Sequence, residues 1–280
     1  MATTELAVEP WLTGLKFPRG MRWHDGQLWF TDILARAVRV SVPGQAEARL
    51  LAEIPAKPAG LSFDVSGELF VVSMDDCSVL RYGPSGFEPY ADFSTQQWAM
   101  LTDMTVDPET GIAYVAARPA GQHEPGAVVS AQADGATAIA AIVEHPNGMT
   151  VIPGTRELVV ADVNNEQLLS FEIHKDGTLS AAGIFAMLPG RHPHGLCADA
   201  AGAVWTTAYL TGEVLRVERG GDITHRVGLA PDRWALACTL GGEDRTTLFI
   251  ASALTSPEQW GRGESDGWID TAAAPAGVWR

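Results

Sequence analysis

The chain has 280 residues, of which 46% are hydrophobic and 19% charged, a balance that supports a sizeable core and excludes disorder. Its formal net charge of −15 disfavours polyanionic partners, so neither nucleic acid nor an anionic membrane surface is expected to bind. The start has no basic leader and no stretch approaches the ~20 apolar residues of a membrane span, which predicts a cytoplasmic protein.

Cysteine usage and known motifs narrow the function classes further. The three cysteines, Cys77, Cys197 and Cys238, are an odd number, which implies no disulfide framework. Cys197 and Cys238 fall within apolar runs, where a thiol packs as a small hydrophobic side chain. The sequence contains no structural zinc spacing, no P-loop and no dinucleotide fingerprint.

The first expected element is a strand at about residues 6–15, and six pairs of short strands follow it. The leading strands recur every ~40 to 47 positions, the period of four-stranded propeller blades. They lie at residues 20–23, 60–63, 103–106, 148–151, 195–198 and 235–238. Their partners are rich in β-branched and aromatic residues and lie at residues 28–30, 69–72, 113–115, 158–160, 204–206 and 248–250.

Two irregular segments interrupt the repeat. Residues 117–126 are rich in Gly and Pro and are expected to form a loop at one mouth of the channel. Residues 255–266 precede a terminal strand at 267–270, beside which the N-terminal strand should complete the last blade. The sequence therefore predicts an all-β fold, a six-bladed β-propeller of four-stranded antiparallel blades, as a single domain over residues 1–280.

The residues just before the six leading strands are candidates for a functional site. In a propeller these positions converge on the rim of the central channel, a natural place for a ligand. Four of them are polar and one is a large aromatic residue; the six are Arg19, Ala59, Thr102, Asn147, His194 and Trp234.

Several segments resemble the senescence-marker-protein/gluconolactonase/luciferin-regenerating-enzyme family. The resemblance runs from about Leu15 to the C-terminus, and the segments that carry it are residues 22–32, 145–151, 192–199 with 202–205, and 240–242 with 247–249. It implies a six-bladed propeller that usually holds a divalent metal at the channel mouth and typically opens lactones or hydrolyses related esters.

The ring departs from the pattern that this resemblance implies. Family members usually have Glu at the position of Arg19, Asn at that of Thr102 and Asp at that of His194, and only Asn147 matches. A guanidinium would repel a hard cation such as Ca²⁺, so no metal or other cofactor is expected. A softer ion such as Zn²⁺ would have to be held by Asn147 and His194, with help from Asp103 or another histidine.

The catalytic candidates are His194, Arg19, Asn147 and Asp103. His194 can act as a general acid or base, and Arg19 can stabilise a developing oxyanion in place of the metal. Arg19 could equally form a structural ion pair with Asp103 or Asp32, and Asn147 could be a turn residue before a glycine. The resemblance aligns Asp103 with an Asp that the family commonly retains.

Further residues are candidates for contact with the substrate. Thr102 belongs to the ring, Trp234, Trp98 and Tyr209 could wall an apolar pocket, and His145 and His192 each lie two residues before a ring residue. Large aromatics are more often core residues, and these two histidines could be ordinary surface groups.

These observations favour a lactonase-like hydrolase that acts on a small cyclic ester or related carbonyl compound. Two alternatives stay open: a metal-independent lyase, isomerase or cyclase that uses His194, and a small-molecule-binding propeller without catalysis. The expected partner is a small-molecule substrate, and the chain is expected to be a monomer or a homodimer.

Overall fold

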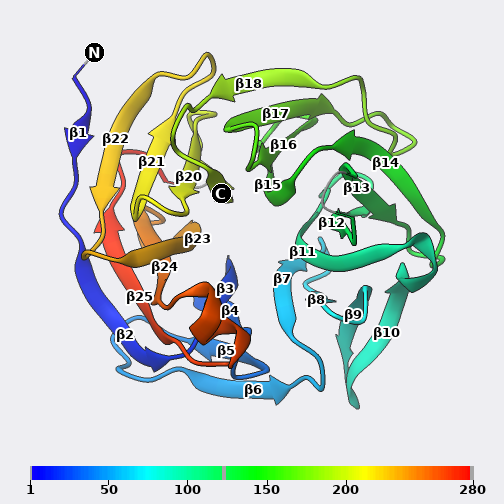
Figure 1. The fold of residues 1–280 in the computed structure, drawn as a ribbon, viewed down its shortest axis with the longest axis horizontal. Coiled ribbons are helices and arrows are strands. Elements are labelled where there is room, and N and C mark those ends of the chain that lie inside the picture. The colour runs from blue at the N-terminus through cyan, green and yellow to red at the C-terminus, as the bar shows by residue number, and fades with distance from the viewer. Residues whose placement is uncertain (1, 122–123, 278–280) are drawn as a thin grey trace.

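Six antiparallel sheets surround one central axis in the computed structural model, which describes residues 2–121 and 124–277 (Figure 1). The predicted six-bladed β-propeller with four-stranded blades is therefore confirmed. Every predicted strand pair forms the two innermost strands of a blade. Because inner strands of all blades meet around the axis, residues at their starts share one rim.

The blades follow chain order, and the strands of the first five run from the axis outward as the chain proceeds. The first three blades are β3 (Pro18–His24), β4 (Gln27–Asp32), β5 (Ala37–Ser41) and β6 (Arg49–Glu53); β7 (Pro58–Phe63), β8 (Leu69–Ser73), β9 (Ser78–Gly83) and β10 (Gly86–Asp92); and β11 (Trp98–Val106), β12 (Ala113–Pro119), β13 (Gly126–Ala131) and β14 (Thr137–Val143). A 3₁₀ turn, Ser94–Gln96, precedes β11.

The remaining blades include both ends of the described chain. The fourth is β15 (Pro146–Val151), β16 (Glu157–Asp162), β17 (Gln167–Glu172) and β18 (Gly183–Met187), and the fifth is β19 (Pro193–Ala198), β20 (Val204–Ala208), β21 (Glu213–Val217) and β22 (Ile223–Gly228), with β1 (Thr4–Glu5) added in parallel. The sixth, from its inner to its outer strand, is β23 (Arg233–Gly241), β24 (Thr247–Leu254), β25 (Asp266–Ala273) and β2 (Glu9–Leu15).

The predicted closure of the ring by the N-terminal strand is confirmed. β2 pairs antiparallel with β25, with Glu9 opposite Thr271, and it forms the outer strand of the sixth blade (Figure 1). Leu12 of β2 is 1% exposed and belongs to the main apolar core. The closure therefore buries apolar side chains as well as satisfying the edge of β25.

Glycines at the starts of inner strands allow neighbouring blades to approach one another closely. A Cβ on Gly148 would overlap the carbonyl oxygen of His194 and lie 2.8 Å from Cα of Gly195. A Cβ on Gly60 or on Gly195 would lie 2.6 Å from Cα of Asp103 or of Ala237, respectively. The repeated glycine in the sequence thus reflects backbone contact between adjacent inner strands.

Each inner strand also contains a register shift near its start, beside these close contacts. The shifts follow Arg19, Pro58, Leu101, Pro146, Pro193 and Ala235. A bulge bends the strand and re-aims its side chains, which is how ring residues come to face the channel mouth.

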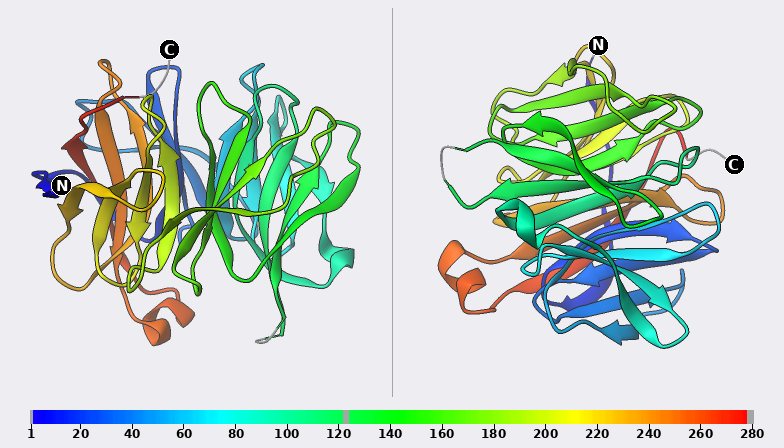
Figure 2. Two further views of the ribbon diagram at one scale, coloured as in Figure 1. Left: turned by 90° about the horizontal axis from the view of Figure 1, so that it is seen from above. Right: turned by 90° about the vertical axis from the view of Figure 1, so that its right-hand side faces the viewer.

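The two irregular segments lie at the same end of the ring. α1 (Pro257–Gly261) interrupts residues 255–266, with Ser256 capping its N-terminus and Pro257 in its first turn. Figure 2 shows α1 projecting from the end of the ring at which β12 stops and β13 begins, opposite the C-terminal end of the described chain. The expected loop is shorter than residues 117–126, because β12 continues to Pro119 and β13 begins at Gly126; residues 122 and 123 lie outside the described part.

The three cysteines are buried and free, and for Cys197 and Cys238 this agrees with the prediction of small hydrophobic side chains. The Sγ atoms of Cys197 and Cys238, on neighbouring inner strands, lie 3.8 Å apart. Over the described residues, no helix is both long enough and apolar enough to cross a bilayer.

Candidate functional site

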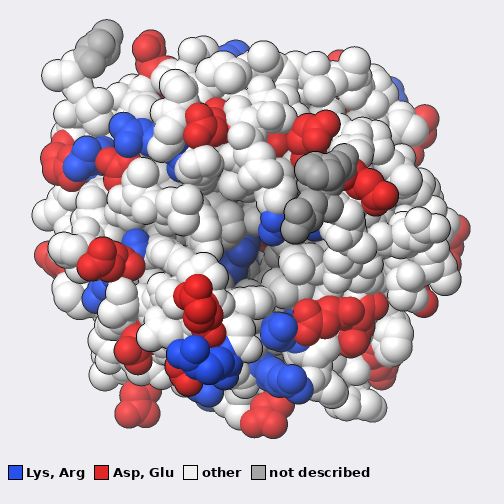
Figure 3. Space-filling view, viewed as in Figure 1, with Lys and Arg blue, Asp and Glu red and all other residues white. Residues whose placement is uncertain are grey.

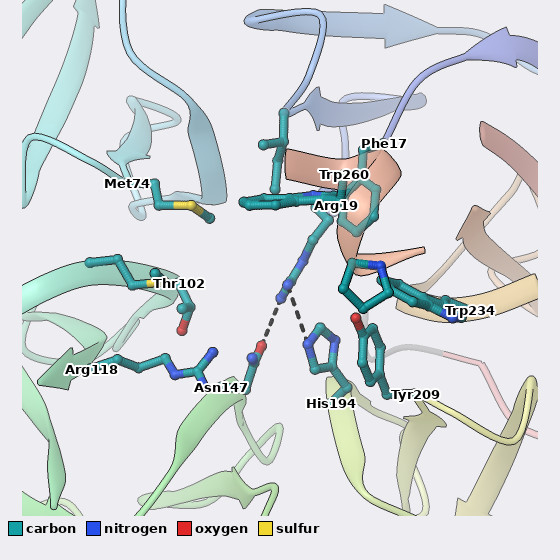
Figure 4. Close-up of a pocket in the computed structure, with 13 residues that line it drawn as sticks. Phe17, Arg19, Met74, Thr102, Arg118, Asn147, His194, Tyr209, Trp234 and Trp260 are labelled. Carbon is teal, nitrogen blue, oxygen red and sulfur yellow. Dashed lines mark hydrogen bonds between the residues drawn. The ribbon is translucent and has the colours of Figure 1, made fainter. Parts of the chain in front are cut away.

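A cavity of about 320 Å³ lies at the channel mouth (Figures 3 and 4). Its polar lining residues are Arg19, Thr102, Arg118, Asn147 and His194, and its apolar and aromatic ones are Phe17, Ile33, Met74, Met100, Tyr209, Trp234, Pro257 and Trp260. Figure 3 shows basic side chains inside the central hollow of this face. The cavity is at the small end of the ~300–1,000 Å³ range of small-molecule sites.

Arg19 connects two other ring residues across the channel. Its Nη2 donates a hydrogen bond to Oδ1 of Asn147 at 2.7 Å, and its Nη1 lies 3.4 Å from Nε2 of His194 (Figure 4). The side chain is only 6% exposed, and burial lowers the pKa of its guanidinium although nearby Asp103 opposes that shift. An arginine remains protonated in such a setting, so a fixed positive charge sits at the base of the cavity.

His194 is held in one tautomer. Its Nδ1 lies 3.0 Å from the carbonyl oxygen of Leu236, which can only accept, so Nδ1 carries the proton and Nε2 is the acceptor. The ring stacks on Tyr209 with centroids 4.7 Å apart. Burial, and then the positive charge of Arg19, lowers the pKa of His194 well below its ordinary value. The imidazole is therefore neutral at pH 7, with its lone pair directed toward Arg19.

Aromatic side chains form one wall of the cavity. Tyr209 packs against Trp234 with ring centroids 4.9 Å apart, and Phe17 packs edge-on against Trp260 at 6.3 Å. Burial raises the pKa of Tyr209 to about 12, so its hydroxyl stays protonated. This wall offers a dry surface for the apolar part of a ligand.

The opposite wall carries Arg118, from β12, and Thr102, from β11. Burial and the like charge of Arg19 lower the pKa of Arg118. Its Nη2 lies 3.5 Å from Nδ1 of His145. Thr102 is 2% exposed, and its hydroxyl has no hydrogen-bond partner among the described residues.

Asp103 does not line the cavity, contrary to the expectation of a catalytic carboxylate there. It is buried outside the cavity lining, accepts a hydrogen bond from the backbone N–H of Met104 at 2.8 Å, and lies 4.0 Å from Nη2 of Arg22. Burial raises its pKa, while Arg22 and Arg19 act in the opposite sense. The alternative ion pair of Arg19 with Asp32 does not form in the described part either, since Asp32 accepts the amides of Lys16 and Phe17.

Three further candidates lie outside this cavity. His145 lines a neighbouring cavity of about 540 Å³ that shares Arg118 with the first, and burial and Arg118 lower its pKa to about 4. His192 is 3.4 Å from a carboxylate oxygen of Glu166 and contacts neither cavity. Trp98 begins β11 and packs against the main core instead of the cavity.

The sixth ring position is occupied by Leu236 and not, as comparison of the six repeats predicts, by Trp234. The register shift in β23 falls between Ala235 and Ala237, which places Leu236 level with the other ring residues. Leu236 contributes its carbonyl to His194. Trp234 precedes it by two residues and still reaches the cavity.

Sequence reasoning missed Arg118 and Trp260, which both line the cavity. Arg118 directly follows the apolar run 113–117 on the second strand of its blade. A charged residue at the end of such a strand that faces the channel mouth could have indicated a residue of the site. Trp260 lies on α1, whose Ser-Pro start is a typical helix N-terminus.

Residues 17–254 match the sequence model of the SMP-30/Gluconolactonase/LRE-like region. The chain belongs to this family. A curated relative, 6-deoxy-6-sulfogluconolactonase from Pseudomonas putida, is 32% identical over 110 residues. That alignment spans 38% of this chain and 38% of the relative.

Solved structures show the same fold. A luciferin-regenerating enzyme has a TM-score of 0.80 at 16% identity, with 98% of each chain covered. Regucalcin from Agrobacterium tumefaciens, described as a calcium-binding protein, has a TM-score of 0.77 at 16% identity, with 100% of each chain covered. At these identities the likeness concerns the fold alone.

The donor set at the channel mouth does not fit the divalent metal that the family resemblance implies. Oδ1 of Asn147 and Nε2 of His194 are the obvious ligand atoms, and both are directed at the guanidinium of Arg19. The described residues contain no cluster of three or more His, Cys, Asp or Glu side chains that could hold an ion. A hard cation would need carboxylate oxygens where this site has a positive charge.

Proposed function

We propose that this protein is a lactone hydrolase that works in the channel-mouth cavity without a bound metal ion. Membership of the gluconolactonase-like family supports a lactonase-type hydrolase in general, and the partial relative named as a lactonase agrees with it. The observation that carries the proposal is the buried pair of Arg19 and neutral His194, 3.4 Å apart on the ring that lines the cavity.

Arg19 is the electrophilic group in this proposal. A lactone carbonyl oxygen placed against its guanidinium would accept a charge-assisted hydrogen bond that strengthens as the oxygen becomes an oxyanion. Asn147 holds the guanidinium in position through the 2.7 Å hydrogen bond. Loss of a comparable oxyanion donor costs about 10²–10³ in kcat.

His194 is the general base. Its 3.4 Å contact with Nη1 of Arg19 is long for a hydrogen bond, so a water molecule can replace it at Nε2. Nε2 then accepts a proton from this water as the water oxygen bonds to the carbonyl carbon, and the ring C–O bond breaks. The same proton passes to the leaving alkoxide, which gives a carboxylic acid and a hydroxyl on one molecule, and the acid then releases its proton to solvent as a carboxylate forms. Nδ1–H stays on the carbonyl of Leu236, which fixes the imidazole plane.

Replacement of His194 tests this assignment. His194→Gln should lower kcat for lactone hydrolysis by about 10²–10⁴-fold, the usual contribution of a general base. The matched control is His225→Gln on the outer strand β22, which should retain full activity. Turnover in H₂¹⁸O should place one labelled oxygen in the carboxylate. Full activity of His194→Gln, or product without label, contradicts the proposal.

A further inference from the structure

Arg19 and Arg118 differ from the other arginines in how their charge is balanced. Every other described arginine that is buried or half-buried has a carboxylate oxygen within 4.0 Å, such as Asp199 for Arg216 at 2.7 Å. Arg19 and Arg118 have none among the described residues, and both line the same cavity. Two like charges in one buried space are costly, and a bound anion would relieve that cost.

The donors of Arg118 are mostly free. Its guanidinium makes one long contact in the described part, 3.5 Å from Nδ1 of His145. A guanidinium presents a planar fork of N–H donors that matches a carboxylate, sulfonate or phosphate. Arg19, by contrast, is engaged with Asn147 and His194. In the proposed function it faces the reacting carbonyl.

Thr102 adds an independent observation. Its hydroxyl is buried without a partner in the described part of the chain, and the side chain lines the cavity beside Arg118 (Figure 4). A buried hydroxyl that nothing satisfies destabilises the protein. A ligand oxygen held between Thr102 and Arg118 would accept from both.

Neutralising side chains are missing from the lining. No Asp or Glu of the described residues lines this cavity. Asp103, whose carboxylate acts on Arg19, is buried outside the lining and lies 4.0 Å from Arg22. In a chain with a net charge of −15, this concentration of positive charge in one small space is a local exception.

We infer that the substrate carries an anionic group, a carboxylate, sulfonate or phosphate, that Arg118 and Thr102 bind while Arg19 faces the reacting carbonyl. This inference rests on the proposed function for the lactone part of the ligand. The aromatic wall of Tyr209 and Trp234 then contacts the ring of the substrate. Arg118, which is not one of the six ring residues, is thus a determinant of substrate specificity.

Binding without hydrolysis separates this inference from the proposed function. Calorimetry would compare tetrahydrofuran-2-carboxylate, which has no lactone bond, with its uncharged amide. The carboxylate should bind at least tenfold more tightly than the amide, and Arg118→Gln should remove that difference. Arg49→Gln, on the exposed outer strand β6, is the matched control and should leave it unchanged. Methanesulfonate and inorganic phosphate as competitors identify which anion the site prefers.

Kinetics give the second arm. A γ-lactone with a carboxylate on its ring should have kcat/KM at least tenfold above that of the methyl-substituted lactone. Arg118→Gln should abolish this preference, whereas Arg49→Gln should keep it. Arg118→Lys, which keeps the positive charge but loses the planar set of N–H donors, should recover part of the preference for the charged lactone. Equal binding and turnover of charged and neutral probes by the unaltered protein overturns the anion site but leaves lactone hydrolysis intact. Arg118-dependent anion binding with no lactone hydrolysed supports the anion site and overturns the proposed function.

Discussion

Arg19 is the residue that separates this site from the metal site implied by the family resemblance. It places a guanidinium where that resemblance implies a glutamate, and it occupies the two atoms best suited to bind a cation, Oδ1 of Asn147 and Nε2 of His194. A guanidinium and a divalent metal can both stabilise an oxyanion. In the proposed function, Arg19 therefore supplies the electrophilic assistance for which the family resemblance implies a metal.

Restoring a carboxylate at this position tests that view. Arg19→Glu should create a set of three metal ligands, formed by the new carboxylate, Asn147 and His194. Titration calorimetry should then detect Zn²⁺ or Ca²⁺ binding that the unaltered protein lacks. Arg49→Glu makes the same change of charge on β6 and should bind neither ion specifically. Equally tight binding by the unaltered protein, or none by Arg19→Glu, counts against the account.

The lowered pKa of His194 predicts the pH dependence of the reaction. An ordinary histidine loses about three quarters of its neutral form between pH 8 and pH 6. Because burial and Arg19 favour the neutral form of His194, kcat/KM should stay constant over that range and fall only at lower pH. Initial rates in overlapping buffers, corrected for spontaneous hydrolysis, check this. An inflection at or above pH 6.5 would show that His194 is not the base, or that its imidazole is not buried.

Residue-level reasoning from the sequence found the ring but not all of the cavity. Arg19, Asn147 and His194 were predictable because each precedes the same repeated strand. Arg118 and Trp260 come from a second strand and from an inserted helix, and the repeat contains no information about either. Trp98 failed as a wall residue because a large aromatic residue packs into a core as readily as into a cavity.

At the scale of elements, the inner strands position the site. The six predicted strand pairs and the closure by β2 are confirmed because the period of the repeat and the need to satisfy the edge of β25 leave little choice. The sixth ring position was wrong by two residues. No glycine marks residues 235–238, so nothing in the sequence indicated that the register shift falls at Leu236.

The contact between β15 and β19 gives a test at this scale. Gly148→Ala would drive a methyl group into the carbonyl of His194 and to 2.8 Å from Cα of Gly195, so β19 must shift. We expect a loss of about 1–3 kcal/mol in the free energy of unfolding by urea, together with reduced kcat, because His194 moves with the strand.

Gly261→Ala is the matched control for that experiment. Nothing lies within 4 Å of a Cβ at this position in α1, so the free energy of unfolding should hardly change. If Gly148→Ala is as stable and as active as this control, the proposed close packing of the inner strands is wrong.

At the scale of the whole molecule, charge is distributed unevenly. The chain carries 34 acidic and 19 basic residues, yet the described lining of the channel-mouth cavity contains two arginines and no carboxylate. Figure 3 shows basic side chains in the central hollow of this face and both acidic and basic ones on the surface around it. The fold thus keeps a positively charged cavity inside a negatively charged protein.

The most direct test of metal-free lactone hydrolysis is an assay of the purified protein on a panel of γ- and δ-lactones. Acid release would be followed with and without a strong chelator, and the panel would include carboxylate-bearing rings. We expect hydrolysis at the same rate in both conditions, because Arg19 and His194 need no ion. Activity that the chelator abolishes and an added divalent metal restores would contradict the account, as would the absence of hydrolysis for every lactone.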